Sequence, residues 1–416
     1  MNHTNQRATH FRSMVAMCAI GTFALPAAGL SSAVQPATIP YLSADVPQAT
    51  EVNAAFTDFA QDRVDLVVAF EEMRHATEHV INRWSVAQLM GTSDAMVGRY
   101  ADARKIKNAH RPVRPYCATG ARWPDSARTI GSDIEVLLIN EDHLNPMTRA
   151  AIIEALPVLK DMGFKRLALE SIPSDTVAQQ LAKGFVPDAP SSGVYLREPV
   201  EAQLVHRAVE LGFQLVPYDT DTEGEDREAS QAAALNRFIK LGGGRLVVVA
   251  GHAHVSKADG WLGEKLEHTY PGRIFSIDQT RGAEAQCDKS VISRRLVNAA
   301  LPDTTTNTAR LRVDAEIITP ATMASDRERA TKSSWLTLAG LRHPLRVNSN
   351  ELCPSKEGAC LIQAYRREAP IGSVPEDRFL AVNNGWSGFL FVTPGRYVIK
   401  GLNTSGHGSS INVTVP

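Results

Sequence analysis

The chain has 416 residues, with 44 Lys and Arg against 45 Asp and Glu, and 44% of its residues are hydrophobic. This composition is typical of globular proteins and excludes a disordered or fibrous protein. At about 150 residues per domain, the length allows two or three domains. The formal net charge of -1 provides no basic surface for a polyphosphate, so nucleic acid is not expected as a partner.

The first 33 residues have the layout of a secretory signal peptide. Arg7 and Arg12 precede an apolar run from Met14 to Leu30, and small residues follow it. Pro26 interrupts this run, which is shorter than the roughly 20 residues that a membrane-spanning helix needs. The alternative is a retained membrane anchor. We expect cleavage, a periplasmic or secreted protein, and no stable membrane span afterwards.

Removal of this segment, with Cys18, would leave four cysteines: Cys117, Cys287, Cys353 and Cys360. An even number suits an oxidising compartment. Three connectivities are possible. The short loop between Cys353 and Cys360 favours a local disulfide, which leaves Cys117 and Cys287 as the second candidate pair.

The rest of the chain divides into a tether, an α/β region and a β-rich end. Residues 34–50 are rich in Pro, Ala and Ser and predict a tether. Apolar residues at helical spacing over residues 51–100 predict a helical prelude to an α/β domain that we place at 51–300. Short apolar runs between Gly, Pro and Asn turns predict a small β-rich C-terminal domain, placed at 301–416.

Within the α/β region, strand-like runs alternate with helical ones from about residue 131 to residue 279. The expected strands cover residues 134–139, 165–169, 213–217, 245–250 and 274–277, and the expected helices cover 146–162, 201–211, 226–241 and 258–268. Such alternation predicts a mostly parallel sheet flanked by helices.

Polar residues that could carry chemistry follow several of these strands. Ligands of open α/β sheets bind beyond the carboxyl ends of the strands. The strand-end residues are Glu141, His143, Glu170, Asp219, His252 and His254. Imidazole and carboxylate groups at converging strand ends could hold a divalent metal, or could act as a general base and its orienting partner. The plainer alternative is that these histidines cap helices or bond loop carbonyls.

The segment from Asp219 to Gly224 is similar to the start of a calcium-binding loop, but the twelfth position is Ser230 instead of Glu. The alternative is a solvated acidic loop before a helix. Arg227 lies in the first turn of that helix, where the helix dipole disfavours a positive charge. We therefore expect Arg227 to bind an anion or to pair with Glu170.

Taken in order, these elements resemble the superfamily that joins the ChaN-like haem-binding lipoproteins, the erythromycin esterases, and the TraB and TIKI proteins. The first motif of that group, Gly-Glu-x-His after a strand, is similar to Asn140-Glu141-Asp142-His143. The spacing to Asn145-Pro146 is closest to the ChaN-like branch. Its later elements are matched by Glu170, by Arg227-Glu228 and by Gly251-His252-Ala253-His254.

The resemblance covers about residues 134–279 and departs at Asn140, which stands where the pattern has Gly. It implies one cleft lined by catalytic residues, which would be Glu141, His143, Glu170, Arg227 and His254. His143 and His254 would be metal ligands or acid–base groups, and Glu141 or Glu170 would activate water. Glu141 and His252 are further candidate metal ligands.

Members of the superfamily look like metal-dependent proteases, metal-free esterases or haem binders. The expected function is therefore a secreted hydrolase of ester or amide bonds in a small-molecule or peptide substrate, with a divalent transition metal as the possible cofactor. The alternative is a periplasmic haem- or metal-binding protein without turnover. A third hypothesis is an adhesion or scaffold protein that binds through its C-terminal domain. The sequence leaves the oligomeric state open.

Overall fold

The computed structural model describes residue 70 and residues 84–110, 114–116, 120–219, 226–280, 282–284, 294–298, 311–320, 329–354, 358–382 and 385–416. The expected signal peptide, the tether and most of the helical prelude lie outside the described residues. So do Cys117, Cys287 and most of the acidic segment after Asp219. Among the described residues, no helix is long and apolar enough to cross a membrane.

An eight-stranded sheet in the order β2-β9-β10-β7-β3-β6-β4-β5 forms the centre of the α/β region. Its strands are β2 (Ala121–Arg122), β3 (Val136–Glu141), β4 (Phe164–Leu169), β5 (Gln214–Pro217), β6 (Arg245–Gly251), β7 (Ile274–Asp278), β9 (Arg295–Asn298) and β10 (Ala315–Ile318). The strands from β10 to β5 pair in parallel, and β9 and β2 extend the sheet by antiparallel pairing. The predicted α/β fold with a mostly parallel sheet is confirmed.

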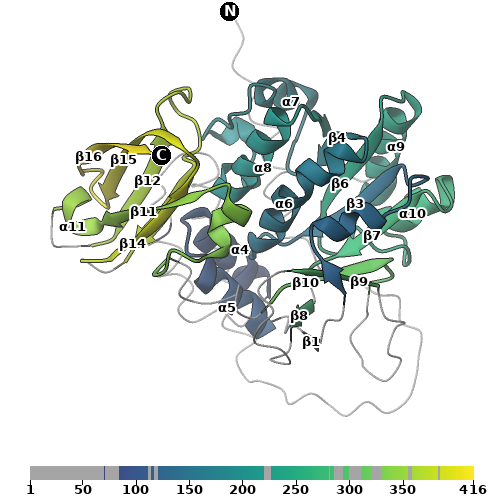
Figure 1. Ribbon diagram of the computed structural model, residues 1–416, viewed down its shortest axis with the longest axis horizontal. Helices are drawn as coiled ribbons and strands as arrows, with labels where there is room; N and C mark the ends of the chain where they lie inside the picture. Colours follow the sequence, from purple (N-terminus) through teal and green to yellow (C-terminus); the bar gives the residue numbers. More distant parts are fainter. Residues whose placement is uncertain are drawn as a thin grey trace, which may run out of the picture.

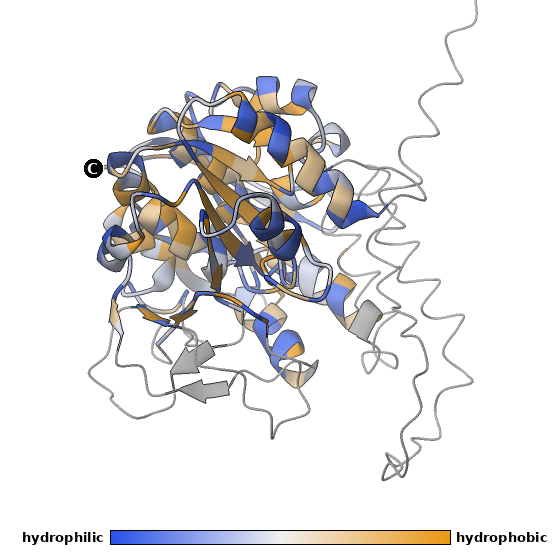
Figure 2. Ribbon diagram, turned by 90° about the vertical axis from the view of Figure 1, so that its right-hand side faces the viewer, coloured by the Kyte–Doolittle hydropathy of each residue, from blue (hydrophilic) through white to orange (hydrophobic). Residues whose placement is uncertain are grey.

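Helices cover both faces of this sheet (Figure 1). They are α6 (Met147–Asp161), α7 (Asp175–Leu181), α8 (Pro199–Glu210), α9 (Arg227–Lys240) and α10 (Leu262–Thr269). Because successive residues of a strand point to opposite faces, Leu137 belongs to the apolar core beneath α6 and α8, whereas Leu138 belongs to the core beneath α9 and α10. Figure 2 shows mostly hydrophobic strands inside and surrounding helices that contain both hydrophilic and hydrophobic residues.

Helix α10 begins later than residue 258, where the sequence pattern placed its start. Asp259 and Gly260 both have positive φ values, of 60° and 78°, which a continuous right-handed helix does not allow. The chain therefore turns first, and the helix begins at Leu262 after Trp261 at the N-cap.

The last part of the predicted helical prelude contains α4 (Trp84–Met96), and α5 (Tyr100–His110) begins where the predicted prelude ends. Short 3-10 turns occur at η1 (Asp125–Thr129), η2 (Pro190–Ser192), η3 (Tyr195–Arg197) and η4 (Trp335–Gly340). A small parallel pair joins β1 (Arg114–Tyr116) and β8 (Gly282–Glu284).

The C-terminal region is rich in antiparallel strands, as predicted. A four-stranded sheet has the order β13-β12-β15-β16, and β11 pairs with β14 beside it. These elements are β11 (His343–Asn348), α11 (Ser349–Leu352), β12 (Cys360–Arg366), β13 (Asp377–Ala381), β14 (Ser387–Val392), β15 (Gly395–Asn403) and β16 (Ser410–Val415). The Cys353–Cys360 disulfide is present. Since β10 lies in the large sheet, the C-terminal sheets begin after it, well past residue 301.

Candidate active site

The carboxyl ends of three neighbouring strands form the edge of the sheet at which the candidate residues lie. β3 pairs with β6 so that Glu141 lies opposite Gly251, and β4 lies on the other side of β6. Glu170 follows β4 directly, and its backbone N–H donates to the Val249 carbonyl of β6. Glu141 and Glu170 therefore flank the end of β6, where the fold class places a ligand.

A first group of side chains, which we call the β3 cluster, is built on Glu141, His143 and Arg149. Nδ1 of His143 lies 2.5 Å from Glu141 Oε1, and Nη2 of Arg149 lies 2.9 Å from Glu141 Oε2. A carboxylate facing Nδ1 favours the tautomer with the proton on that nitrogen. Nε2 of His143 is then the ring nitrogen that can exchange a proton with a bound molecule.

His143 is held in place from its side as well. Its ring stacks on that of Tyr195, with centroids 3.8 Å apart and an angle of 19° between the planes. Burial alone would lower the pKa of His143, but the negative charge and hydrogen bond of Glu141 raise it above its ordinary value. The ring therefore keeps its proton to a higher pH than a free imidazole does, and a positioned imidazole can serve as an acid–base group.

Two glutamates of the α8 N-terminus share Arg149 and complete the β3 cluster. Nη1 of Arg149 lies 2.9 Å from Glu198 Oε2, and its Nε lies 3.1 Å from Glu201 Oε2. Glu198 is also the N-cap of α8 and accepts from two backbone N–H groups. Burial raises the pKa of Glu201 to about 7, because the attraction of Arg149 offsets it only in part. Glu201 therefore holds a proton up to about neutral pH.

A second group, the β4 cluster, consists of Glu170, Asp219, Arg227, Glu228 and His254. Nη2 of Arg227 lies 2.5 Å from Glu170 Oε1 and 2.8 Å from Asp219 Oδ2. Nδ1 of His254 lies 2.7 Å from Glu228 Oε1, and its Nε2 lies 3.3 Å from Nη1 of Arg227. The expected pairing of Arg227 with Glu170 is confirmed. Two carboxylates offset the unfavourable position of this cation in the first turn of α9.

Glu170 is ionised at any working pH. Burial would raise its pKa, but the positive charges of His254 and Arg227 and a hydrogen bond from the Gly251 N–H lower it to about 2. Burial would also lower the pKa of His254, and the charges of Glu170 and Glu228 instead raise it. A Cβ at position 251 would lie 3.3 Å from Glu170 Oε2, so glycine permits this close approach.

The two clusters act on each other electrostatically. The charge of His143 lowers the pKa of Glu170, and the charge of Glu170 raises the pKa of His143. The structure therefore brings Glu141, His143, Glu170, Arg227 and His254 to one edge of the sheet, in two adjoining clusters.

Asn140 connects the ends of three strands. Its Nδ2 donates to the His252 carbonyl after β6 and to Asp278 Oδ1 of β7, both at 2.8 Å, and its Oδ1 accepts from the Gln279 N–H. The side chain is fully buried. A glycine could not make these bonds, so here Asn140 braces the strand end that carries Glu141.

His252 and His254 do not continue β6 in an extended form. The chain turns directly after Gly251, where the His254 N–H donates to the Gly251 carbonyl. The rings of two histidines spaced i, i+2 lie on one face only in an extended chain, so this turn does not give His252 and His254 a shared face. His252 instead acts on Asp142, whose pKa is lowered because the positive charges of Lys107 and His252 outweigh burial.

The four residues predicted as metal ligands, Glu141, His143, His252 and His254, do not form a ligand set as they are arranged. His254 faces Glu228 through Nδ1 and the Arg227 guanidinium through Nε2. Among the described residues, no group of three or more His, Cys, Asp or Glu side chains is positioned to hold a metal ion.

The sequence pattern missed Arg149, Glu198 and Glu201, which come from helices. Glu198 carried a usable signal, because an acid directly before Pro199 is typical of an N-cap followed by proline at the first helical position. Arg149 gave none, since an arginine within an amphipathic helix is normally assigned to the solvent face.

No model of a known protein family and no curated protein matches the chain. Similar solved structures include one described as bacterial protein toxins, with 14% identity and a TM-score of 0.30 over 53% of this chain and 55% of that one. Another, a crystal structure of bacterial protein toxins, has 17% identity and a TM-score of 0.28 over 53% and 55% of the two chains. The third is RRSP, a MARTX toxin effector domain from Vibrio vulnificus CMCP6, with 14% identity and a TM-score of 0.27 over 53% and 54%. The chain thus spans about half the length of these structures, and the likeness is too low to support a function.

Proposed function

We propose that this protein is an exported hydrolase that cleaves an ester or amide bond with an activated water molecule. The observation that carries the proposal is the pair of Glu–His contacts, Glu141–His143 and Glu170–His254, at adjacent ends of parallel strands. The order of these residues along the chain resembles the ChaN, erythromycin esterase and TIKI superfamily, and the apolar segment after Arg7 and Arg12 supports export.

His143 is the general base in this proposal. Its Nε2 takes a proton from water while Glu141 stabilises the resulting imidazolium, and the water oxygen adds to the substrate carbonyl. His143 then returns the proton to the departing oxygen or nitrogen. Arg227, about a third exposed, supplies positive charge near the oxyanion that forms between these steps.

The first test is hydrolysis of a panel of p-nitrophenyl esters and peptide p-nitroanilides by the purified chain and by His143→Ala. We expect the variant to lose at least about 100-fold in kcat/KM, the usual contribution of a general base. The matched control is His268→Ala, which removes an exposed imidazole of α10. Hydrolysis by His143→Ala at the parental rate would rule out this role.

Elemental analysis and absorbance spectra of the same preparation, made without chelator or affinity-tag metal, separate the remaining possibilities. About one transition metal per chain, lost in both His143→Ala and His254→Ala, would mean a metal-dependent enzyme. A haem absorbance band without hydrolysis would favour a binding protein over a hydrolase.

A further inference from the structure

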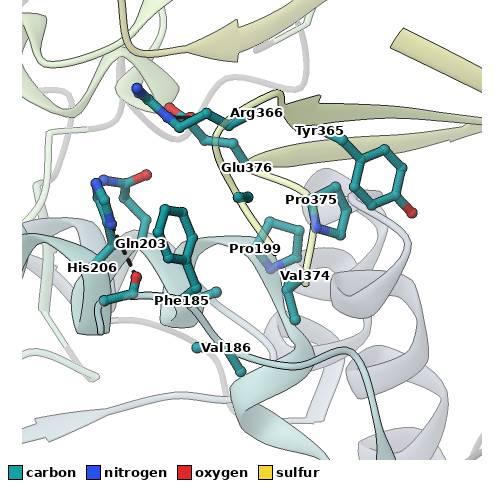
Figure 3. A pocket seen from close by; sticks show the side chains of 13 residues that line it. Phe185, Val186, Pro199, Gln203, His206, Tyr365, Arg366, Val374, Pro375 and Glu376 are labelled. Atoms are coloured by element: carbon teal, nitrogen blue, oxygen red, sulfur yellow. Dashed lines mark hydrogen bonds and ion pairs between the residues drawn. The ribbon is translucent and has the colours of Figure 1, made fainter. Parts of the chain in front are cut away.

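A cavity that shares no lining residue with the two clusters lies between α8 and the C-terminal sheet (Figure 3). Its volume is about 430 Å³ including the part open to solvent. Apolar side chains form much of its wall, among them Phe185, Val186, Pro199, Val374 and Pro375. This lining suits a small ligand with an apolar body, part of which would remain in solvent.

The wall of this cavity is pinned in place by backbone bonds between the two regions of the chain. The Val374 N–H donates to the Val186 carbonyl at 2.8 Å, and the Asp188 N–H donates to the Gly372 carbonyl at 2.7 Å. Pro187 and Ser373 form a β-bridge between these bonds. The cavity is therefore preformed, which reduces the ordering cost of binding.

Gln203 provides a hydrogen-bond donor that is not used within the described part of the chain. Its side chain lines the cavity and is only 4% exposed. Oε1 accepts from Nη2 of Arg342 at 3.3 Å, whereas Nε2 has no hydrogen-bond partner among the described residues. A buried amide N–H without a partner is costly, so a ligand acceptor at this place would be stabilising.

His206 provides the complementary acceptor one helical turn away. Nδ1 of His206 lies 2.9 Å from the Gly184 carbonyl, which requires the proton on Nδ1 and leaves the Nε2 lone pair of the neutral ring to accept. Gln203 and His206 are three residues apart on α8, so they are neighbours on one helix face, and Figure 3 draws them together. The ring of Phe185 packs against His206 with centroids 5.4 Å apart.

The charged groups of the cavity are already paired. Glu376 accepts from the Tyr397 hydroxyl and from the Thr393 N–H, both at 2.6 Å, and Arg366 lies 3.4 Å from the same carboxylate. Neither Glu376 nor Arg366 is therefore a free partner for a charged group of a ligand. The free donor is Gln203 Nε2 and the free acceptor is His206 Nε2. An uncharged carboxamide fits this pair, because it has a carbonyl that accepts and an N–H that donates.

We propose that this cavity binds a small neutral carboxamide that carries an aromatic or other apolar group. The amide carbonyl accepts from Gln203 Nε2, the amide N–H donates to His206 Nε2, and the apolar group packs on Phe185 and the two prolines. This site is separate from the candidate active site and needs no hydrolysis.

The probe for this proposal is phenylacetamide, titrated into the full chain by saturation-transfer difference NMR. Methyl phenylacetate is the matched control, because it keeps the ring and the carbonyl but has no N–H. We expect a dissociation constant in the millimolar range for the amide and binding at least about fivefold weaker for the ester. Gln203→Met should weaken amide binding about tenfold, and His206→Phe should weaken it several-fold.

The control variant is Gln180→Met, which changes an exposed glutamine of α7 and should leave binding unchanged. Circular dichroism and thermal melts establish that each variant is folded before its titration is compared. The proposal is overturned if no saturable binding is seen, if ester and amide bind equally, or if Gln203→Met binds as the parent does. Binding that responds to His143→Ala but not to Gln203→Met would instead locate the probe at the candidate active site.

Discussion

Three neighbouring groups stabilise the charged form of the Glu170 carboxylate. Arg227 and His254 place positive charge beside it, and the Gly251 N–H donates to it. Because its pKa is lowered to about 2 from 4.5, its contribution to stability is complete above about pH 4.5 and is lost as the pH falls toward 2.

We therefore expect Glu170→Gln to flatten the acid limb of the stability curve. As the pH falls from 4.5 to 2, the free energy of unfolding of the parent should decrease more than that of Glu170→Gln. The difference between the two decreases should be on the order of 3 kcal/mol. Urea unfolding at a series of pH values measures this difference. Glu210→Gln, which changes an exposed acid of α8, is the control, and parallel curves for parent and Glu170→Gln would contradict the assignment.

At this scale, the sequence predicted the residues that directly follow strands. Glu141, Glu170 and Arg227 lie where the end of a strand or the start of a helix places them, and the Glu170–Arg227 pair could be anticipated. Arg149 and Glu201 could not, because their roles depend on how α6 and α8 pack against each other, and an acid on a helix is normally assigned to solvent.

At the scale of elements, α8 joins the candidate active site to the core through its N-cap residue. Glu198 caps the helix, accepts from the Tyr100 hydroxyl at 2.8 Å and pairs with Arg149, and it is only 1% exposed. One side chain therefore fixes the helix start, the arginine that orients Glu141, and the contact with α5.

Glu198→Ala should consequently be far more harmful than removal of an ordinary cap. We expect a loss of about 3 to 5 kcal/mol, because a buried charge pair is broken together with the cap. Asp226→Ala, which removes the exposed cap of α9, should cost only about 1 kcal/mol. Chemical denaturation of both variants gives the comparison, and equal losses would show that burial of Glu198 adds nothing.

The element types follow from hydrophobic periodicity, whereas several boundaries do not. β6 reads as a strand because an unbroken Leu-Val-Val-Val-Ala run suits burial on both faces. The start of α10 was missed because Asp259 adopts a positive φ that its residue type does not announce. The order of strands in the sheet depends on pairings distant in sequence, such as β3 with β6, which periodicity does not encode.

At the scale of the whole molecule, the C-terminal sheet lies beside the α/β region (Figure 1). Buried arginines bind the two regions to each other. Nη2 of Arg378 donates to Asp188 Oδ2 at 3.1 Å and to the Arg197 carbonyl at 3.0 Å. Arg329 pairs with Asp377 and also donates to the Gly98 carbonyl. The sequence could predict two regions but not this junction, because an arginine in a turn, such as Arg329, or in a short strand, such as Arg378, is normally assigned to solvent.

Such a junction should make the described regions unfold together. Arg378 is 1% exposed, so its desolvated guanidinium is stable only while both of its partners in the α/β region remain in place. Loss of either region would leave buried charges and carbonyls without partners in the other.

We expect calorimetry of the parent to give a single transition, and Arg378→Met to lower its midpoint by about 5 °C without splitting it. Arg396→Met, which removes an exposed pair with Glu368, should shift the midpoint by less than about 1 °C. Two separate transitions in the parent would mean that the C-terminal sheet is stable without the α/β region, and that the arginines orient the two regions without coupling their unfolding.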